Sequence, residues 1–198
     1  MFKLLSFLFH PFYFLLLGVF VLYTSPTYIN FSTLGQIKIL VYSVILLNTM
    51  VLPALIAGYL NRRGRITSLY LESINDRKLM YLITFGFYLA TLFILSSFKI
   101  NIYVFRFTLG ASLTVAALFI LALFQKKVSA HLSAIGGLCG ALVMLSIKLP
   151  ADFLNLIVVF ILLAGLIGTA RIHEKAHKEN EVYWGFLLGF FIQIFIFY

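Results

Sequence analysis

Long apolar runs separated by short polar segments dominate the chain. Each run is close to the length of about 20 residues that a helix needs to cross the hydrocarbon core of a bilayer. Seven such spans are predicted, over residues 5–23, 36–59, 79–97, 103–124, 130–148, 153–170 and 182–198. The pattern therefore predicts an all-α, polytopic membrane bundle of about seven transmembrane helices, in a single integral membrane domain over residues 1–198.

Composition agrees with this class, since 63% of the 198 residues are hydrophobic and only 11% are charged. A soluble globule of this size cannot bury so much apolar surface. The predicted connections are short, apart from residues 60–78, so no separate soluble domain is expected on either side of the membrane. Any chemistry must then occur at the membrane surface or within the bundle, and no nucleic acid is among the predicted partners.

Basic residues are distributed unequally between the two sets of predicted helix ends. The poorer side carries Lys38, Lys99 and Lys148. The richer side carries Lys3, Arg62, Arg63, Arg65, Arg77, Lys78, Lys126, Lys127, Arg171, Lys175 and Lys178. Because short basic loops are retained in the cytoplasm, we expect the N-terminus and the three basic loops to be cytoplasmic. The predicted location is the bacterial inner, or cytoplasmic, membrane.

Small residues gather in the fifth and seventh predicted spans, at four-residue spacing. They include Gly136 and Gly140 in one span and Gly185 and Gly189 in the other. Such spacing lets helix backbones approach closely, so these two spans are predicted to pack tightly against their neighbours.

Reactive side chains fall on three loops that should share one face, because each pair of loops is separated by two spans. They are Arg77 and Lys78 before the third span, Ser129 and His131 entering the fifth, and Arg171, His177 and Glu181 entering the seventh. Several cations, two imidazoles and one carboxylate suit an anionic, phosphate-like substrate. The sequence therefore predicts a phosphate site at this face.

Two of these segments carry a family resemblance. Val128 to His131 (VSAH) resembles the P-S-G-H motif of the type 2 phosphatidic acid phosphatase superfamily. Arg171, five residues, His177, three residues and Glu181 match the family's R-x5-H-x3-D spacing, with Glu in place of Asp. In the first motif Arg77 supplies the arginine, but Tyr70 occupies the lysine position. The resemblance covers residues 60–198, the expected phosphatase-like core.

The resemblance implies a metal-independent lipid phosphatase that needs no cofactor. It acts on a phosphate or diphosphate monoester of a membrane lipid. It implies that His177 is the nucleophile and forms a phosphohistidine, that Glu181 orients it, and that His131 is the general acid. The implied phosphate-binding residues are Arg171, Arg77, Lys78 and Ser129.

Other interpretations of the same residues stay open. A phosphatase-like protein without turnover could serve as a lipid-binding or structural subunit of a complex, or form a homo-oligomer. His173 to His177 (HEKAH) matches the H-E-x-x-H zinc motif, so a membrane metalloprotease is a further alternative. Single residues also have structural interpretations: Ser129 as a helix cap, His173 as a solvated side chain and His10 as an interfacial one.

Overall fold

The computed structural model describes residues 8–71 and 73–198, in which helices follow one another and no strand occurs. The helices are α2 (Pro11–Thr24), α3 (Tyr28–Ser32), α4 (Gly35–Ile45), η1 (Leu46–Val51), α5 (Leu52–Arg62), α6 (Ile74–Ser96), α7 (Ile102–Leu123), α8 (Ala130–Lys148), α9 (Leu154–His173) and α10 (Glu179–Phe197). Lys3 and the first residues of the first predicted span lie outside the described residues.

The predicted all-α membrane bundle is confirmed. Six described helical segments are long and apolar enough to cross a membrane: Gly35–Arg62, Ile74–Ser96, Ile102–Leu123, Ala130–Lys148, Leu154–His173 and Glu179–Phe197. The described part of the first predicted span is α2, which has only 14 residues. At 1.5 Å per residue it reaches about 21 Å, short of the hydrocarbon thickness of about 30 Å.

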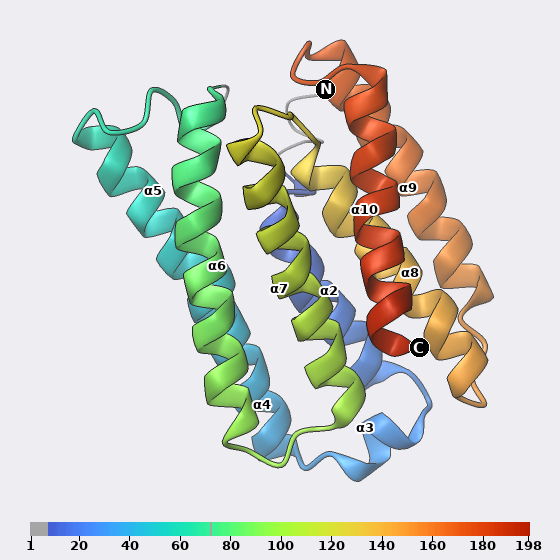
Figure 1. Ribbon diagram of the computed structural model, residues 1–198. Helices are drawn as coiled ribbons and strands as arrows, with labels where there is room; N and C mark the ends of the chain where they lie inside the picture. Colours follow the sequence, from blue (N-terminus) through green and yellow to red (C-terminus); the bar gives the residue numbers. More distant parts are fainter. Residues whose placement is uncertain (1–7, 72) are drawn as a thin grey trace.

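The segment Gly35–Arg62 is one continuous helix with a wider π turn, η1, in its middle. Pro53 lies just after this turn and has no N–H to continue the α-helical hydrogen bonds. A π turn accommodates such an interruption. Beyond it, α5 leans away from the bundle and packs along η1 and α6 (Figure 1).

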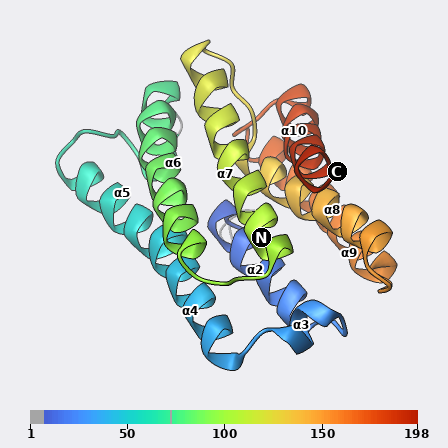
Figure 2. The ribbon, with the colours of Figure 1, turned by 60° about the horizontal axis from the view of Figure 1, so that its bottom comes forward.

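The core of the molecule is α8, which is surrounded by α2, α7, α9 and α10 (Figure 2). Its most extensive contact is with α10; the small residues predicted close packing of each of these two helices, although not that they pack on each other. A Cβ added to Gly136 would lie 2.2 Å from the Phe186 carbonyl oxygen, and one added to Gly189 would lie 1.9 Å from the Ser133 carbonyl oxygen. No side chain fits at either position, so glycine is what allows the two backbones to touch.

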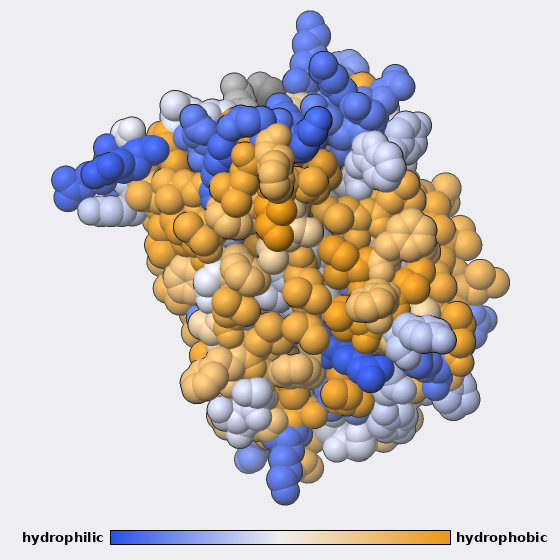
Figure 3. Space-filling view, in the orientation of Figure 1, coloured by the Kyte–Doolittle hydropathy of each residue, from blue (hydrophilic) through white to orange (hydrophobic). Residues whose placement is uncertain are grey.

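The two ends of the bundle differ in polarity. Loops 63–71, 124–129 and 174–178 all lie at the top end of the bundle in Figure 1. Figure 3 shows polar residues gathered over this end and an apolar body below it. We call it the basic end. The predicted convergence of three distant loops on one face is therefore observed.

Candidate phosphate site

The loop between α9 and α10 begins with a tight helix ending. Lys175 N–H donates to the Ile172 carbonyl (2.9 Å), and Ala176 N–H donates to the Arg171 carbonyl (3.1 Å). This pair of bonds is a Schellman motif, in which the residue after the cap is left-handed. Lys175 takes that position with a φ of 54°, although glycine is the usual residue there. The turn places His177 between the end of α9 and the start of α10.

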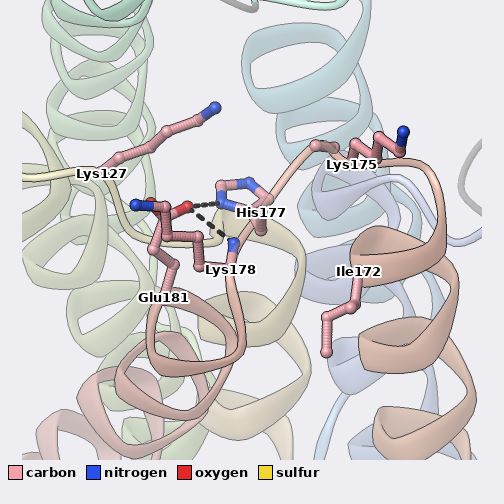
Figure 4. Close-up of a pocket in the computed structure, with 7 residues that line it drawn as sticks. Lys127, Ile172, Lys175, His177, Lys178 and Glu181 are labelled. Atoms are coloured by element: carbon pink, nitrogen blue, oxygen red, sulfur yellow. Dashed lines mark hydrogen bonds and ion pairs between the residues drawn. The ribbon is translucent and has the colours of Figure 1, made fainter.

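His177 is held by a carboxylate from the first turn of α10. Its Nδ1–H donates to Glu181 Oε2 over 2.7 Å (Figure 4). The same oxygen accepts the Lys178 backbone N–H at 3.4 Å, which is the usual role of a glutamate at the third position of a helix. Only 1% of the His177 side chain is exposed. One carboxylate thus caps α10 and fixes the imidazole ring.

Arg77 reaches the other ring nitrogen of His177 from α6. Its Nη1 lies 3.5 Å from His177 Nε2, while its Nε donates to the Leu71 carbonyl at 2.7 Å. The loop that carries Leu71 is fastened by Asp76, whose carboxylate accepts from both the backbone N–H and the hydroxyl of Thr67. Arg77 is buried. The loop before α6 therefore aims the guanidinium at the histidine.

His177 is a neutral imidazole with a defined tautomer. Burial lowers its pKa from 6.5 to about 2, and the charges of Arg77, Arg171 and Lys127, together with His131, add to that effect. Because Nδ1–H is donated to the carboxylate, Nε2 carries the lone pair and accepts from Arg77. The site therefore presents an unprotonated nitrogen toward a fixed cation.

Arg171 is the second buried guanidinium of the site and lies in the last turn of α9. Its Nη1 forms an ion pair of 2.9 Å with Glu174 Oε2. Its Nε is buried and has no hydrogen-bond partner in the described part of the chain. A buried donor without an acceptor is costly, and a phosphate oxygen would satisfy it.

The start of α8 connects the second predicted motif to the third. Ser129 N–H donates to the Glu181 carbonyl at 3.1 Å, and Ser129 Oγ caps α8 by accepting from Leu132 N–H at 3.5 Å. Ser129 is fully buried. The structure thus gives Ser129 the capping role, and its phosphate contact stays a prediction. His131, in the first turn of α8, is half-buried and acts electrostatically on His177.

A cavity of about 460 Å³ opens beside His177 at the basic end (Figure 4). Its wall carries three lysines and one carboxylate: it consists of Lys127, Ile172, Lys175, Ala176, His177, Lys178 and Glu181. Such a lining favours an anion over a neutral ligand.

Not every predicted site residue joins this group. Lys78 follows Arg77 on α6 but is half-buried, and no hydrogen bond or ion pair within the described residues joins it to His177 or Arg171. Tyr70, at the lysine position of the first motif, is 73% exposed. One residue of the degenerate first motif, Arg77, therefore reaches the site.

The geometry of the HEKAH segment differs from that of a zinc-binding helix. His173 is the last residue of α9 and is exposed, whereas His177 follows the left-handed turn at Lys175 and is buried. The two histidines are therefore not one turn apart on one helix face, as the H-E-x-x-H motif requires. Across residues 8–71 and 73–198, no group of three or more His, Cys, Asp or Glu could hold a metal ion.

Two residues near the site carried no functional prediction. Lys127 lines the cavity, although in the sequence it counted only toward topology. His10 contacts the His131 ring, with 5.5 Å between ring centroids, although it was interpreted as interfacial. The position of Lys127 two residues before Ser129 could have indicated the first, but no sequence pattern connects His10 to residue 131.

No protein-family model matches the chain, and neither the curated proteins nor the solved structures contain a match to it. A functional assignment consequently depends on the residues themselves and on their geometry.

Proposed function

We propose that this protein is a membrane lipid phosphatase that hydrolyses a phosphate or diphosphate monoester through a phosphohistidine. The observation that supports it most is the environment of His177: a carboxylate holds Nδ1 at 2.7 Å, and a buried arginine faces Nε2 at 3.5 Å. A neutral histidine oriented by a carboxylate is a suitable nucleophile, and an adjacent cation suits the charge of a phosphoryl group.

The proposed reaction has two steps. In the first, the Nε2 lone pair of His177 attacks phosphorus, the P–O ester bond breaks, and His131 donates a proton to the leaving oxygen. In the second, His131 takes a proton from water, whose oxygen attacks phosphorus; the P–N bond breaks, inorganic phosphate leaves, and His177 and protonated His131 are restored. Arg77 and Arg171 hold the phosphoryl oxygens in both steps. The Arg77 contact of 3.5 Å is long for a hydrogen bond, so a phosphate oxygen can replace it at little cost.

A lipid substrate is favoured by the position of the site. The cavity lies at the basic end, beside the apolar body of the bundle, so a phosphorylated headgroup can enter it while its chains remain in the bilayer. Phosphate and diphosphate monoesters both present a terminal dianion to these cations. The excess of Lys and Arg at this end supports a cytoplasmic orientation in a bacterial inner membrane.

The test is phosphate release by the purified protein from a panel of lipid phosphates and diphosphates, with a metal chelator present. Replacing His177 with Gln should lower the rate at least about 1,000-fold, because the covalent route is lost. The matched control is His173→Gln, which removes an exposed imidazole at the same end and should retain the activity.

Two results would contradict the proposal. Activity that the chelator abolishes and zinc restores would indicate a metalloenzyme. Absence of phosphate release across the panel, with lipid binding retained, would favour the non-catalytic subunit, for which the incomplete first motif is the supporting observation.

A further inference from the structure

His10 lies immediately before α2 and caps it. Its Nδ1 accepts the Phe12 backbone N–H at 3.4 Å, and Pro11 occupies the first helical position. Histidine is an uncommon N-cap compared with Ser, Thr, Asp or Asn, which perform this function with shorter side chains. Capping by itself therefore does not explain an imidazole at this position.

The ring of His10 extends toward the candidate site. It meets the His131 ring edge-on, at an interplanar angle of 76° and a centroid distance of 5.5 Å. Burial, and then the positive charge of Arg171, lower the pKa of His10 to about 4. Two segments thus meet at this ring: the start of α2 and the first turn of α8.

The hydrogen bond to Phe12 also fixes the tautomer of His10. Nδ1 is the acceptor, so the single ring proton of the neutral imidazole is on Nε2. His10 is thus a neutral donor of fixed orientation beside the predicted general acid. In a site crowded with cations, a neutral ring packs against His131 without adding another positive charge beside it.

We propose that His10 is a positioning residue of the phosphate site, which holds the His131 imidazole in the orientation needed to protonate the leaving group. This role rests on the proposed lipid phosphatase function. It goes beyond the family resemblance, because none of the three resembling motifs includes the segment before α2.

Replacing His10 with Asn tests the contact of the His10 ring with His131 separately from the capping of α2. Asparagine is among the best N-cap residues, so α2 stays capped while the contact with His131 is lost. We expect His10→Asn to melt within about 2 °C of the wild type, and kcat to fall about ten-fold with less than a two-fold change in KM, as for a misplaced general acid. Wild-type kcat in His10→Asn would overturn the proposal, since a cap would then be the whole role of His10.

A second readout does not depend on turnover. In protein labelled at its histidines, the NMR titration of His131 should shift upward by about 0.5 pH unit or more in His10→Asn, because water replaces a neutral ring at its edge. His173→Asn is the matched control and should leave that midpoint unchanged. An unchanged His131 midpoint in His10→Asn would refute the positioning role. A shifted midpoint without phosphate release by the wild type would refute the phosphatase proposal and retain the His10–His131 contact.

Discussion

The site is built from two regions that pack very differently. The C-terminal helices and the loops between them supply most of the site: Arg171 from α9, Glu181 from α10, Ser129 from the N-cap of α8 and His177 from the loop before α10. In this region the backbones of α8 and α10 touch at glycines. Arg77 comes from α6, which packs mainly along α7 and along the segment Gly35–Arg62. The C-terminal region thus forms a rigid frame, and the α4–α6 region supplies one cation to it.

The same division runs through the sequence motifs. The third motif, with its full spacing, lies in the rigid frame, and the incomplete first motif lies in the α4–α6 region. Within that region Arg77 does not depend on tight helix packing, because the Leu71 carbonyl and the Asp76 clamp aim it locally. One arginine fixed by its own loop can therefore take part in a site that the rest of its motif does not reach.

The largest expected effect comes from opening the frame. In Gly189→Ala the new Cβ would lie 1.9 Å from the Ser133 carbonyl oxygen, so α8 and α10 must separate. We expect a loss of about 3 kcal/mol or more in the free energy of unfolding, measured in detergent. The matched control is Gly86→Ala on α6, where nothing lies within 4 Å. Equal stability of the two variants would contradict the rigid-frame description.

The second prediction concerns Arg77, the residue that the α4–α6 region contributes to the site. Arg77→Ala should lower kcat/KM about 100- to 1,000-fold, because a cation facing the phosphoryl group is lost, and Arg77→Lys should recover only part of it. The pKa of His177 should rise, since Arg77 is the charged group that depresses it most. If Arg77→Ala retained wild-type activity, the phosphate site would consist only of residues of the rigid frame.

Acid should destabilise the frame through His177. The pKa of His177 is about 2 in the folded protein, below the value of 6.5 for an unfolded chain. Below pH 6.5 the unfolded state binds a proton that the folded state does not, so stability falls as the pH falls. Between pH 6.5 and 4.5 we expect this histidine to account for a loss of about 2 kcal/mol.

The measurement is the free energy of unfolding against pH for the wild type and His177→Gln. The variant should lose less stability over that interval, whereas His173→Gln, which alters an exposed histidine, should follow the wild type. Parallel curves for the wild type and His177→Gln would refute the buried neutral histidine.

A smaller effect is expected at the helix endings. Helices α5 and α9 both end in Schellman motifs, but α5 uses Gly64 (φ 66°) and α9 uses Lys175 (φ 54°), which lines the cavity. Lys175→Gly should relieve the left-handed strain and raise stability by about 1 kcal/mol, while weakening inhibition by inorganic phosphate. A variant that is stabilised without weaker inhibition would show that Lys175 is no part of the phosphate site.

Much of the fold and part of the candidate site could be predicted from the sequence. Apolar run length predicted the spanning helices, and glycine spacing predicted that α8 and α10 pack closely, although not that they pack on each other. The spacing of Arg171, His177 and Glu181 anticipated the His177–Glu181 pair, although His177 lies just before the N-cap of α10 and not on the helix itself. The first predicted span, residues 5–23, lies only in part within the described residues, where run length did not reveal that the helix begins at Pro11 and ends at Thr24. The His10–His131 contact depends on tertiary packing, which no local pattern encodes.

The sequence also left Glu174 without a role outside the zinc motif. In the structure its carboxylate forms an ion pair of 2.9 Å with Arg171 Nη1. A phosphate that binds Arg171 must share or displace this carboxylate, which is an anion already present in the site. Glu174 therefore acts as an internal competitor within the rigid frame, unlike Arg77, whose guanidinium is bound by neutral groups.

Glu174→Gln should consequently bind inorganic phosphate about three-fold more tightly, because the charge of the competitor is removed while its size and hydrogen-bonding capacity are kept. The inhibition constant of phosphate against lipid phosphate hydrolysis measures this directly. Glu179→Gln is the matched control: it removes an exposed carboxylate at the start of α10 and should leave the inhibition constant unchanged. Weaker phosphate binding in Glu174→Gln would mean instead that the carboxylate orients Arg171 for the substrate. The Arg171–Glu174 ion pair would then preorganise the rigid frame and not compete with phosphate for Arg171.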